Sequence, residues 1–244
     1  MGEKMEAVLE VNNVSKHFGG FTALNGVNLH VQRGERLGLI GPNGSGKTTM
    51  INCISGALIN DGGTIRFNGR DIHGLPAYQR TKLGIARSFQ IPRPFGSMTV
   101  LENLLVPFAY VGGADGPKER REAMDILDRM GLAAKAEVSS KQLSQVELRK
   151  MELARAMAAK PQLLISDEAM AGLAGAEVDE VLQILFDLNA MGITIIMIEH
   201  IMQAVMKFSQ RVVCLDAGKI ICEGTPESIF KNPDVQRAYL GDEA

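Results

Sequence analysis

Residues 41–48 have the residue types and spacing of a loop that holds a phosphate chain. They read Gly-Pro-Asn-Gly-Ser-Gly-Lys-Thr and fit G-x-x-x-x-G-K-[ST]. The glycines let the backbone curl so that N–H groups point at phosphate oxygens, and a following helix adds its positive end. Lys47 then places a cation between the β and γ phosphates, and the Thr48 hydroxyl can bind Mg²⁺. The residues predicted to bind nucleotide here are Gly41, Pro42, Asn43, Gly44, Ser45, Gly46, Lys47, Thr48 and Thr49.

A chance Gly-rich turn is the alternative interpretation of this loop, expected from composition in about one chain in a hundred. The context argues against chance, because an apolar run at residues 37–40 precedes the loop and a helix is predicted at about residues 47–55. The sequence therefore predicts binding of ATP with magnesium, and hydrolysis of that ATP.

Two carboxylates end an apolar segment farther along the chain, residues 163–168. Asp167 can hold Mg²⁺ directly or through water. Glu168 can polarise the water that attacks the γ-phosphorus. An ordinary acidic strand end is about equally good as an explanation when the segment is taken alone. The phosphate loop shifts the balance toward catalysis. His200 follows the buried run 193–198 and is by itself more often structural, so it gains weight only from the order of the motifs.

Composition and charge limit the classes of function. The 244 residues carry 26 Lys and Arg against 28 Asp and Glu, a formal net charge of -2, which argues against nucleic acid as a partner. Cys53, Cys214 and Cys222 lack metal-ligand spacing, and reduced buried thiols are favoured over a disulfide or zinc site. Residues 1–8 show no secretory signal, and the apolar runs are too short to cross a bilayer. A membrane role would therefore need a partner.

The elements that must position these residues are read from hydrophobic periodicity. Strands are predicted at residues 8–11, 24–31, 37–40, 64–67, 163–166 and 193–198, and a hairpin at 211–215 and 219–222. Helices are predicted at residues 47–55, 176–191 and 199–209, with a short one after Thr225 that has Pro226 in its first turn. Strands that alternate with helices indicate a mainly parallel sheet covered on both faces.

The middle of the chain has loop signals and helical patterns in place of alternating strands and helices. Pro92, Pro94, Pro107 and Gly112–Gly113 predict a loop-rich region. Helices are then expected at residues 118–130, with Gly131 as the stop, and at residues 144–159, with Ser144 and Glu147 as a capping box. The sequence predicts a small helical lobe at about residues 91–158, inserted into an α/β core.

Three further stretches carry a resemblance over nearly the whole length. They are residues 88–90 (Ser-Phe-Gln) with 98–104, residues 167–173, and residues 223–226 through 232–235 and 238–241. Together with the loop and the acidic pair, they resemble the ATP-binding subunit of an ABC transporter, most similarly those of branched-chain amino-acid importers. The resemblance implies an α/β fold: a P-loop NTPase core with a mainly parallel sheet, an antiparallel β subdomain and an inserted α-helical subdomain. It makes residues 1–244 one nucleotide-binding domain, with about 1–90 and 159–244 as the ATP-binding core.

The same resemblance assigns roles to individual residues. Phe18 matches the aromatic that stacks on adenine, although a core phenylalanine is the alternative. Gln90 matches the glutamine that senses Mg²⁺ and water and links the site to the membrane subunit. Glu168 matches the catalytic glutamate, and His200 the histidine that contacts the γ-phosphate. The implied cofactors are ATP and Mg²⁺, the implied catalytic residues are Glu168, His200 and Gln90, and the implied metal ligands are Thr48, Gln90 and Asp167.

The chain departs from the family at its signature, Leu-Ser-Gly-Gly-Gln, which here reads Leu-Ser-Gln-Val-Glu at residues 143–147. Ser144 is retained as a nucleotide contact. Val146 replaces the glycine that lets the backbone approach the partner's γ-phosphate, and Glu147 adds a negative charge. Two such subunits resemble a head-to-tail sandwich in which each site uses one chain's loop and the other chain's signature. We therefore expect a heterodimer with unequal sites, while a homodimer would have two weakened sites.

A second departure follows the acidic pair. Ala169 stands where the family has proline, and residues 172–175 (Gly-Leu-Ala-Gly) replace Gly-Leu-Asn-Pro. Ala174 cannot make the polar contact across the dimer that Asn makes, so looser communication between the two sites is expected.

The expected function is that of an ATPase subunit that powers import of a small solute, branched-chain amino acids or a related polar compound. The implied partners are a second ATPase subunit, transmembrane permease subunits and, indirectly, an extracytoplasmic solute-binding protein. The expected location is cytoplasmic, peripheral on the inner face of the membrane. A regulatory cassette with little hydrolysis is the main alternative, because of Val146. A non-transport ABC ATPase would carry tandem cassettes or a long coiled coil, and the sequence has neither.

Overall fold

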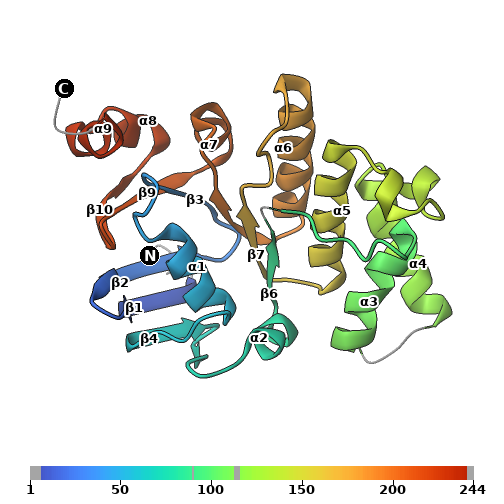
Figure 1. Ribbon diagram of the computed structural model, residues 1–244, viewed down its shortest axis with the longest axis horizontal. Coiled ribbons are helices and arrows are strands. Elements are labelled where there is room, and N and C mark those ends of the chain that lie inside the picture. Colours follow the sequence, from blue (N-terminus) through green and yellow to red (C-terminus); the bar gives the residue numbers. More distant parts are fainter. Residues whose placement is uncertain (1–6, 90, 113–115, 241–244) are drawn as a thin grey trace, which may run out of the picture.

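Two sheets and a group of helices make up the chain in a computed structural model, which describes residues 7–89, 91–112 and 116–240 (Figure 1). The larger sheet has six strands in the order β10-β9-β3-β8-β7-β6. Pairing is parallel throughout except between β9 and β10. The strands are β3 (Arg36–Ile40), β6 (Ile85–Ser88), β7 (Leu163–Asp167), β8 (Thr194–Ile198), β9 (Arg211–Asp216) and β10 (Lys219–Gly224).

Parallel pairing places the carboxyl ends of β3, β7 and β8 at one edge of this sheet. Leu39 pairs with Ile198 between β3 and β8, and Asp167 pairs with Ile198 between β7 and β8. The residues that follow these three strands are therefore neighbours, although they are far apart in the sequence. This edge is where the phosphate loop, the acidic pair and His200 come together.

Both faces of the parallel sheet are covered. Along β7 and β8, Leu164, Ile195 and Met197 pack into a core formed with the helices α3 to α7. The alternate residues, Ile165 and Ile196 among them, pack into a second core with α1 (Lys47–Ser55) and the smaller sheet. Since successive side chains of a strand point to opposite faces, this division explains why both strands are continuously apolar.

The smaller sheet is antiparallel, with the order β2-β1-β4-β5. Its strands are β1 (Ala7–Phe18), β2 (Phe21–Gln32), β4 (Gly62–Phe67) and β5 (Arg70–Asp71). The predicted strands at residues 8–11, 24–31 and 64–67 lie inside longer observed ones. The predicted fold class, a mainly parallel core with an antiparallel sheet and a helical insertion, is confirmed.

A group of helices lies at the side of β6 and β7 that is away from the smaller sheet (Figure 1). It contains α3 (Val100–Gly112), α4 (Pro117–Arg129), the short η1 (Ala133–Lys135) and η2 (Ser140–Gln142), and α5 (Gln145–Ala158). The capping box predicted at the start of α5 is confirmed, because Ser144 and Glu147 each accept the other's backbone N–H.

The prediction of a loop-rich region up to residue 113 was wrong for α3. Pro107 lies inside this helix, yet Val100, Leu101, Leu104 and Phe108 form a buried face at helical spacing. Burial of that face outweighs the one backbone hydrogen bond that proline removes.

The remaining helices are α2 (Ala77–Leu83), α6 (Gly175–Ala190), α7 (Met202–Phe208), α8 (Pro226–Phe230) and α9 (Pro233–Leu240). The sequence did not predict α2, β6 or α9. The helix expected at residues 199–209 begins only at Met202, because the chain bends at His200 after it leaves β8. Thr225 caps α8 as expected, and its Oγ1 accepts the Ser228 N–H at 3.3 Å. Within the described ranges, no helix is long and apolar enough to cross a membrane.

Candidate nucleotide-binding site

The loop after β3 is wrapped tightly by its neighbours. Gly41 and Gly46 have φ angles of 151° and 108°, and a Cβ at Gly41 would lie 2.0 Å from the carbonyl oxygen of Leu215. A Cβ at Gly46 would lie 2.6 Å from the carbonyl oxygen of Ala23. Only glycine fits either position. The helix α1 starts directly after Gly46 with no side chain capping it, so its first N–H groups face the loop.

Lys47 and Ser45 show that the loop is built for a group with oxygen atoms. Lys47 is 7 % exposed, and its Nζ donates to the carbonyl oxygens of Gly41 (2.7 Å) and Pro42 (2.9 Å). Burial lowers the pKa of Lys47, partly opposed by the charge of Glu168. The Ser45 hydroxyl is buried without a hydrogen-bond partner among the described residues. A buried cation and an unsatisfied hydroxyl in a glycine loop fit a phosphate group.

Thr48 and Asp167 line one cavity beside the loop, together with Arg87. Asp167 is buried, and its Oδ2 accepts from the Arg87 guanidinium at 2.5 Å. Arg87 also donates to Asn52 Oδ1 at 2.7 Å. A hydroxyl and a carboxylate are the hard oxygen ligands that Mg²⁺ takes alongside nucleotide oxygens, so the residues present fit the predicted ion. Gln90, the third predicted ligand, lies outside the described residues.

Glu168 and His200 face each other across the edge of the sheet. His200 Nε2 lies 3.0 Å from Glu168 Oε1, and both side chains line a cavity with residues 43–49. The backbone of Glu168 has φ 47°, a conformation that non-glycine residues seldom adopt. Strain of this kind persists only where the surroundings enforce it, and it gathers at functional sites. The fold therefore brings the phosphate loop, Asp167, Glu168 and His200 into one place.

Phe18 and Ser144 lie apart from this cavity. Phe18 pairs with Phe21 at the turn between β1 and β2, and its ring is 47 % exposed with Lys16 Nζ 5.6 Å from the ring centre. Phe21, not Phe18, lines the cavity of the phosphate loop. Ser144 is the N-cap of α5, and Glu147 is occupied by the capping box and by an ion pair with Lys135 at 2.5 Å.

Three residues that the sequence analysis missed contact the predicted site. Arg87 binds Asp167, Glu199 binds the segment after Glu168, and Tyr239 binds Gly41. Arg87 left one signal, a charge directly after the apolar residues Ile85 and Ala86. Tyr239 lies in the stretch 238–241 that carries the resemblance, but nothing local in the sequence indicates the contacts of Tyr239 or Glu199, since these join distant segments.

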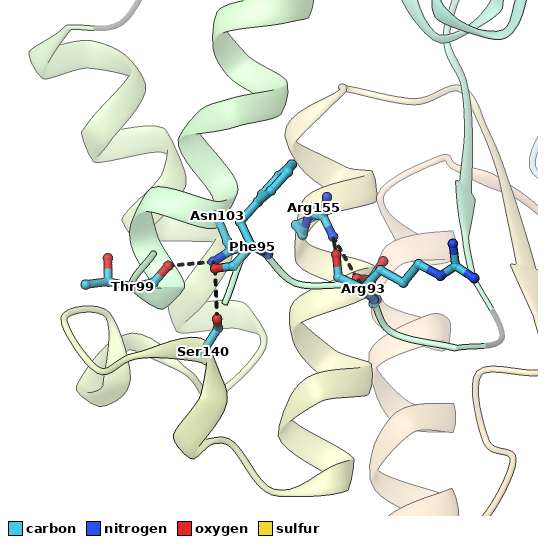
Figure 2. Close-up of polar contacts among 7 residues, drawn as sticks. Arg93, Phe95, Thr99, Asn103, Ser140 and Arg155 are labelled. Atoms are coloured by element: carbon cyan, nitrogen blue, oxygen red, sulfur yellow. Dashed lines mark hydrogen bonds and ion pairs between the residues drawn. The ribbon is translucent and has the colours of Figure 1, made fainter. Parts of the chain in front are cut away.

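A polar network connects the Asp167 cavity to the helical group. The Phe95 carbonyl accepts from Ser140 Oγ (3.1 Å) and Asn103 Nδ2 (3.2 Å), and Arg155 donates to the Arg93 carbonyl at 3.0 Å (Figure 2). Arg93 and Arg155 also line the cavity that contains Thr48 and Asp167, beside the exposed Phe89 and Ile91. This cavity therefore lies between the acidic end of β7 and the helix α5, to which Arg155 belongs.

Comparison with known proteins agrees with this geometry. Residues 24–171 match the family described as ABC transporter, and residues 219–244 match the family described as branched-chain amino acid ATP-binding cassette transporter. The chain is 40 % identical to the high-affinity branched-chain amino acid transport ATP-binding protein LivG of Salmonella typhimurium, over 97 % of this chain and 99 % of LivG.

Solved structures give the same result. The ADP conformation of MJ1267, an ATP-binding cassette of an ABC transporter, aligns with a TM-score of 0.89 and 32 % identity over 97 % of this chain and 100 % of that one. The dimeric post-hydrolysis state of the cassette MJ0796 bound to ADP and Pi aligns with a TM-score of 0.80 and 28 % identity, over 89 % and 98 %. The family match, the relative and the two cassettes agree with the phosphate loop and acidic edge described above, and the chain therefore belongs to the ABC transporter family as an ATP-binding subunit.

Proposed function

We propose that this chain hydrolyses ATP with Mg²⁺ and so powers import of a small solute, branched-chain amino acids or a related polar compound. The observation that carries the proposal is the pair formed by Glu168 and His200, 3.0 Å apart at the mouth of the phosphate loop. A cassette that only bound nucleotide would need the loop but not this pair. Similarity to LivG supports the class of solute.

The residues of the site divide the chemistry between them. Lys47 and the N–H groups of the loop and of α1 stabilise negative charge that develops on the phosphate oxygens. Glu168 orients the attacking water and accepts its proton, and His200 holds both Glu168 and the γ-phosphate in place. Thr48, Asp167 and Gln90 would hold Mg²⁺, which when bound neutralises charge on the β and γ phosphates. For Asp167 to do so, Arg87 must give up its bond or share the carboxylate.

The departures from the family signature and the cavity beside Phe89 and Ile91 indicate the partners of the chain. The dimeric MJ0796 cassette supports pairing of two subunits, and Val146 supports a partner of different sequence with an intact signature. In this proposal Ser144 contacts the partner's nucleotide and Phe18 stacks on adenine. The surface around the cavity that Phe89, Ile91, Arg93 and Arg155 line receives a permease subunit, so that the chain is cytoplasmic and peripheral on the membrane. The helical lobe at about residues 91–158 transmits the motion from a core of about 1–90 and 159–244.

The test is Mg²⁺-dependent phosphate release by the purified chain over a series of protein concentrations, with Glu168→Gln alongside. We expect release that vanishes in the Glu168→Gln chain while nucleotide binding remains. Binding without release in the natural chain would favour the alternative of a regulatory cassette, which the degenerate signature at residues 143–147 supports. Removal of Mg²⁺ by a chelator should stop release without stopping binding.

The same series tests the heterodimer. Release that rises more steeply than linearly with protein concentration would mean that two identical chains complete the sites, and Val146 is then tolerated. Weak release that increases when a cassette with an intact signature is added would support unequal partners.

A further inference from the structure

Glu199 is a buried carboxylate that the mechanism above does not use. It directly follows β8, precedes His200 and is 2 % exposed. Its Oε1 accepts the backbone N–H of Met170 at 2.9 Å, and the backbone of His200 also hydrogen-bonds to the carboxylate. Met170 lies two residues after Glu168 and is fully buried. One side chain thus joins the segment that follows Glu168 to the segment that carries His200.

Arg149 of α5 holds the same segment from the other side. Its guanidinium donates to the Ala171 carbonyl at 2.9 Å, and its charge favours the ionised form of Glu199. The N–H of Met170 and the C=O of Ala171 are therefore each bound by a buried side chain from a different element, and that of Arg149 carries a charge. Hydrogen bonds to charged groups are stronger than those between neutral groups, so this arrangement fixes the turn more firmly than backbone contacts alone.

The turn needs such support because of the backbone at Glu168. Its φ of 47° is strained, and its N–H is bound to the Ile198 carbonyl at 2.9 Å, while its own carbonyl accepts from Ala171 at 3.2 Å. A small rotation here would swing the Glu168 carboxylate away from His200. Burial of a carboxylate costs free energy, and an apolar side chain would fill the space of Glu199 without that cost.

We infer that Glu199 is a positioning residue for ATP hydrolysis: by holding the turn after Glu168 against the end of β8, it fixes the Glu168 carboxylate relative to His200. The inference rests on the proposed hydrolysis. Glu199 itself is not one of the residues that line the cavity of the phosphate loop. Glu199 therefore affects the rate of ATP turnover and not the binding of nucleotide.

Three variants test this in the full chain. Glu199→Ala removes the acceptor, and Glu199→Asp keeps the carboxyl group but shortens its reach. Glu199→Gln keeps an oxygen at the same reach and should recover most of the activity. We expect Ala and Asp to lower kcat by about 10- to 100-fold, because misplacement by about 1 Å has an effect of that size. KM for ATP should change by less than about twofold, and exchange of the Met170 amide proton, followed by NMR, should become faster.

Glu35→Ala is the matched control. Glu35 is a partly buried carboxylate that also accepts a backbone N–H, from Gln32 at 2.7 Å, but it precedes β3 at the opposite edge of the sheet. Its loss should lower stability and leave kcat unchanged. The inference would be overturned if Glu199→Ala and Glu199→Asp both had the kcat of the natural chain. It would also be overturned if kcat of Glu199→Gln were as low as that of Glu199→Ala. If the natural chain releases no phosphate, the proposed function is contradicted instead. In that case the inference is tested separately by Glu199→Ala, and an unchanged rate of exchange of the Met170 amide proton would contradict it.

Discussion

The hydroxyl of Tyr239 accepts a hydrogen bond from the backbone N–H of Gly41, at 2.8 Å. Gly41 is the first residue of the phosphate loop, and Tyr239 belongs to α9, the last helix of the described chain. Around this bond, Ile40, Cys214, Ile229 and Val235 form a small separate core. Burial raises the pKa of Tyr239 to about 12, so the hydroxyl stays neutral at physiological pH. The C-terminal helices therefore hold the loop at its first residue.

Tyr239→Phe should weaken ATP binding about three- to tenfold. The change leaves the Gly41 N–H buried without an acceptor, which costs about 1 kcal/mol, and it loosens the loop that must close on the phosphates. Titration calorimetry with ATP measures the effect. Tyr110→Phe is the control, because Tyr110 is 76 % exposed on α3. Equal affinities in the two variants would mean that the bond does not shape the loop.

Val146→Gly should raise phosphate release by the chain alone about tenfold. Val146 is in the first turn of α5. In the proposed dimer, its β-branched side chain would keep the partner's phosphate from the helix N-terminus. Glycine at this position should lower stability by about 1 kcal/mol, since it is a poor helix former. Steady-state phosphate release is the measurement, and the double change with Glu168→Gln shows that the gain is true hydrolysis. No gain would mean that the signature is not what limits turnover.

Arg80→Met should destabilise the chain by about 3 kcal/mol. Arg80 is 1 % exposed and donates to the carbonyls of Cys53 (2.5 Å), Ile54 (3.0 Å) and Leu75 (2.9 Å). Two of these carbonyls belong to the last turn of α1, which a cation stabilises through the helix dipole. Urea unfolding measures the loss. Arg121→Met, an exposed change on α4, should be nearly neutral, and similar losses in both would refute the capping role.

Glu199→Gln should change how stability depends on pH. Burial raises the pKa of Glu199 from its ordinary 4.5 to about 7. Between these values the unfolded chain releases its proton while the folded chain keeps it, so the free energy of unfolding falls as pH rises. The fall from this group is complete just above pH 7 and amounts to about 3 kcal/mol.

The Gln variant lacks that ionisation. Its stability relative to the natural chain should therefore increase by about 3 kcal/mol between pH 4.5 and 7 and then level off. Urea unfolding at a series of pH values is the measurement. A constant difference between the two chains over this range would show that Glu199 titrates normally.

The features that could be predicted from the amino-acid sequence are those whose geometry is local. The phosphate loop needs glycine at Gly41 and Gly46 because of their φ angles and close neighbours, and a contiguous motif carries that requirement. The capping box at Ser144 acts over three residues and could be predicted in the same way. The strands β7 and β8 could be predicted because burial on both faces makes them almost continuously apolar.

Tertiary structure decided what depends on contacts between distant segments. The helix α3 forms against the proline signal because Leu104 and Phe108 bury a face that only the neighbouring helices supply. Arg87 meets Asp167, Glu199 meets Met170 and Tyr239 meets Gly41 across separations of 80, 29 and 198 residues. No periodicity or local motif encodes such pairs. Parallel strand order brings the first two together, and the packing of α9 brings Tyr239 to Gly41.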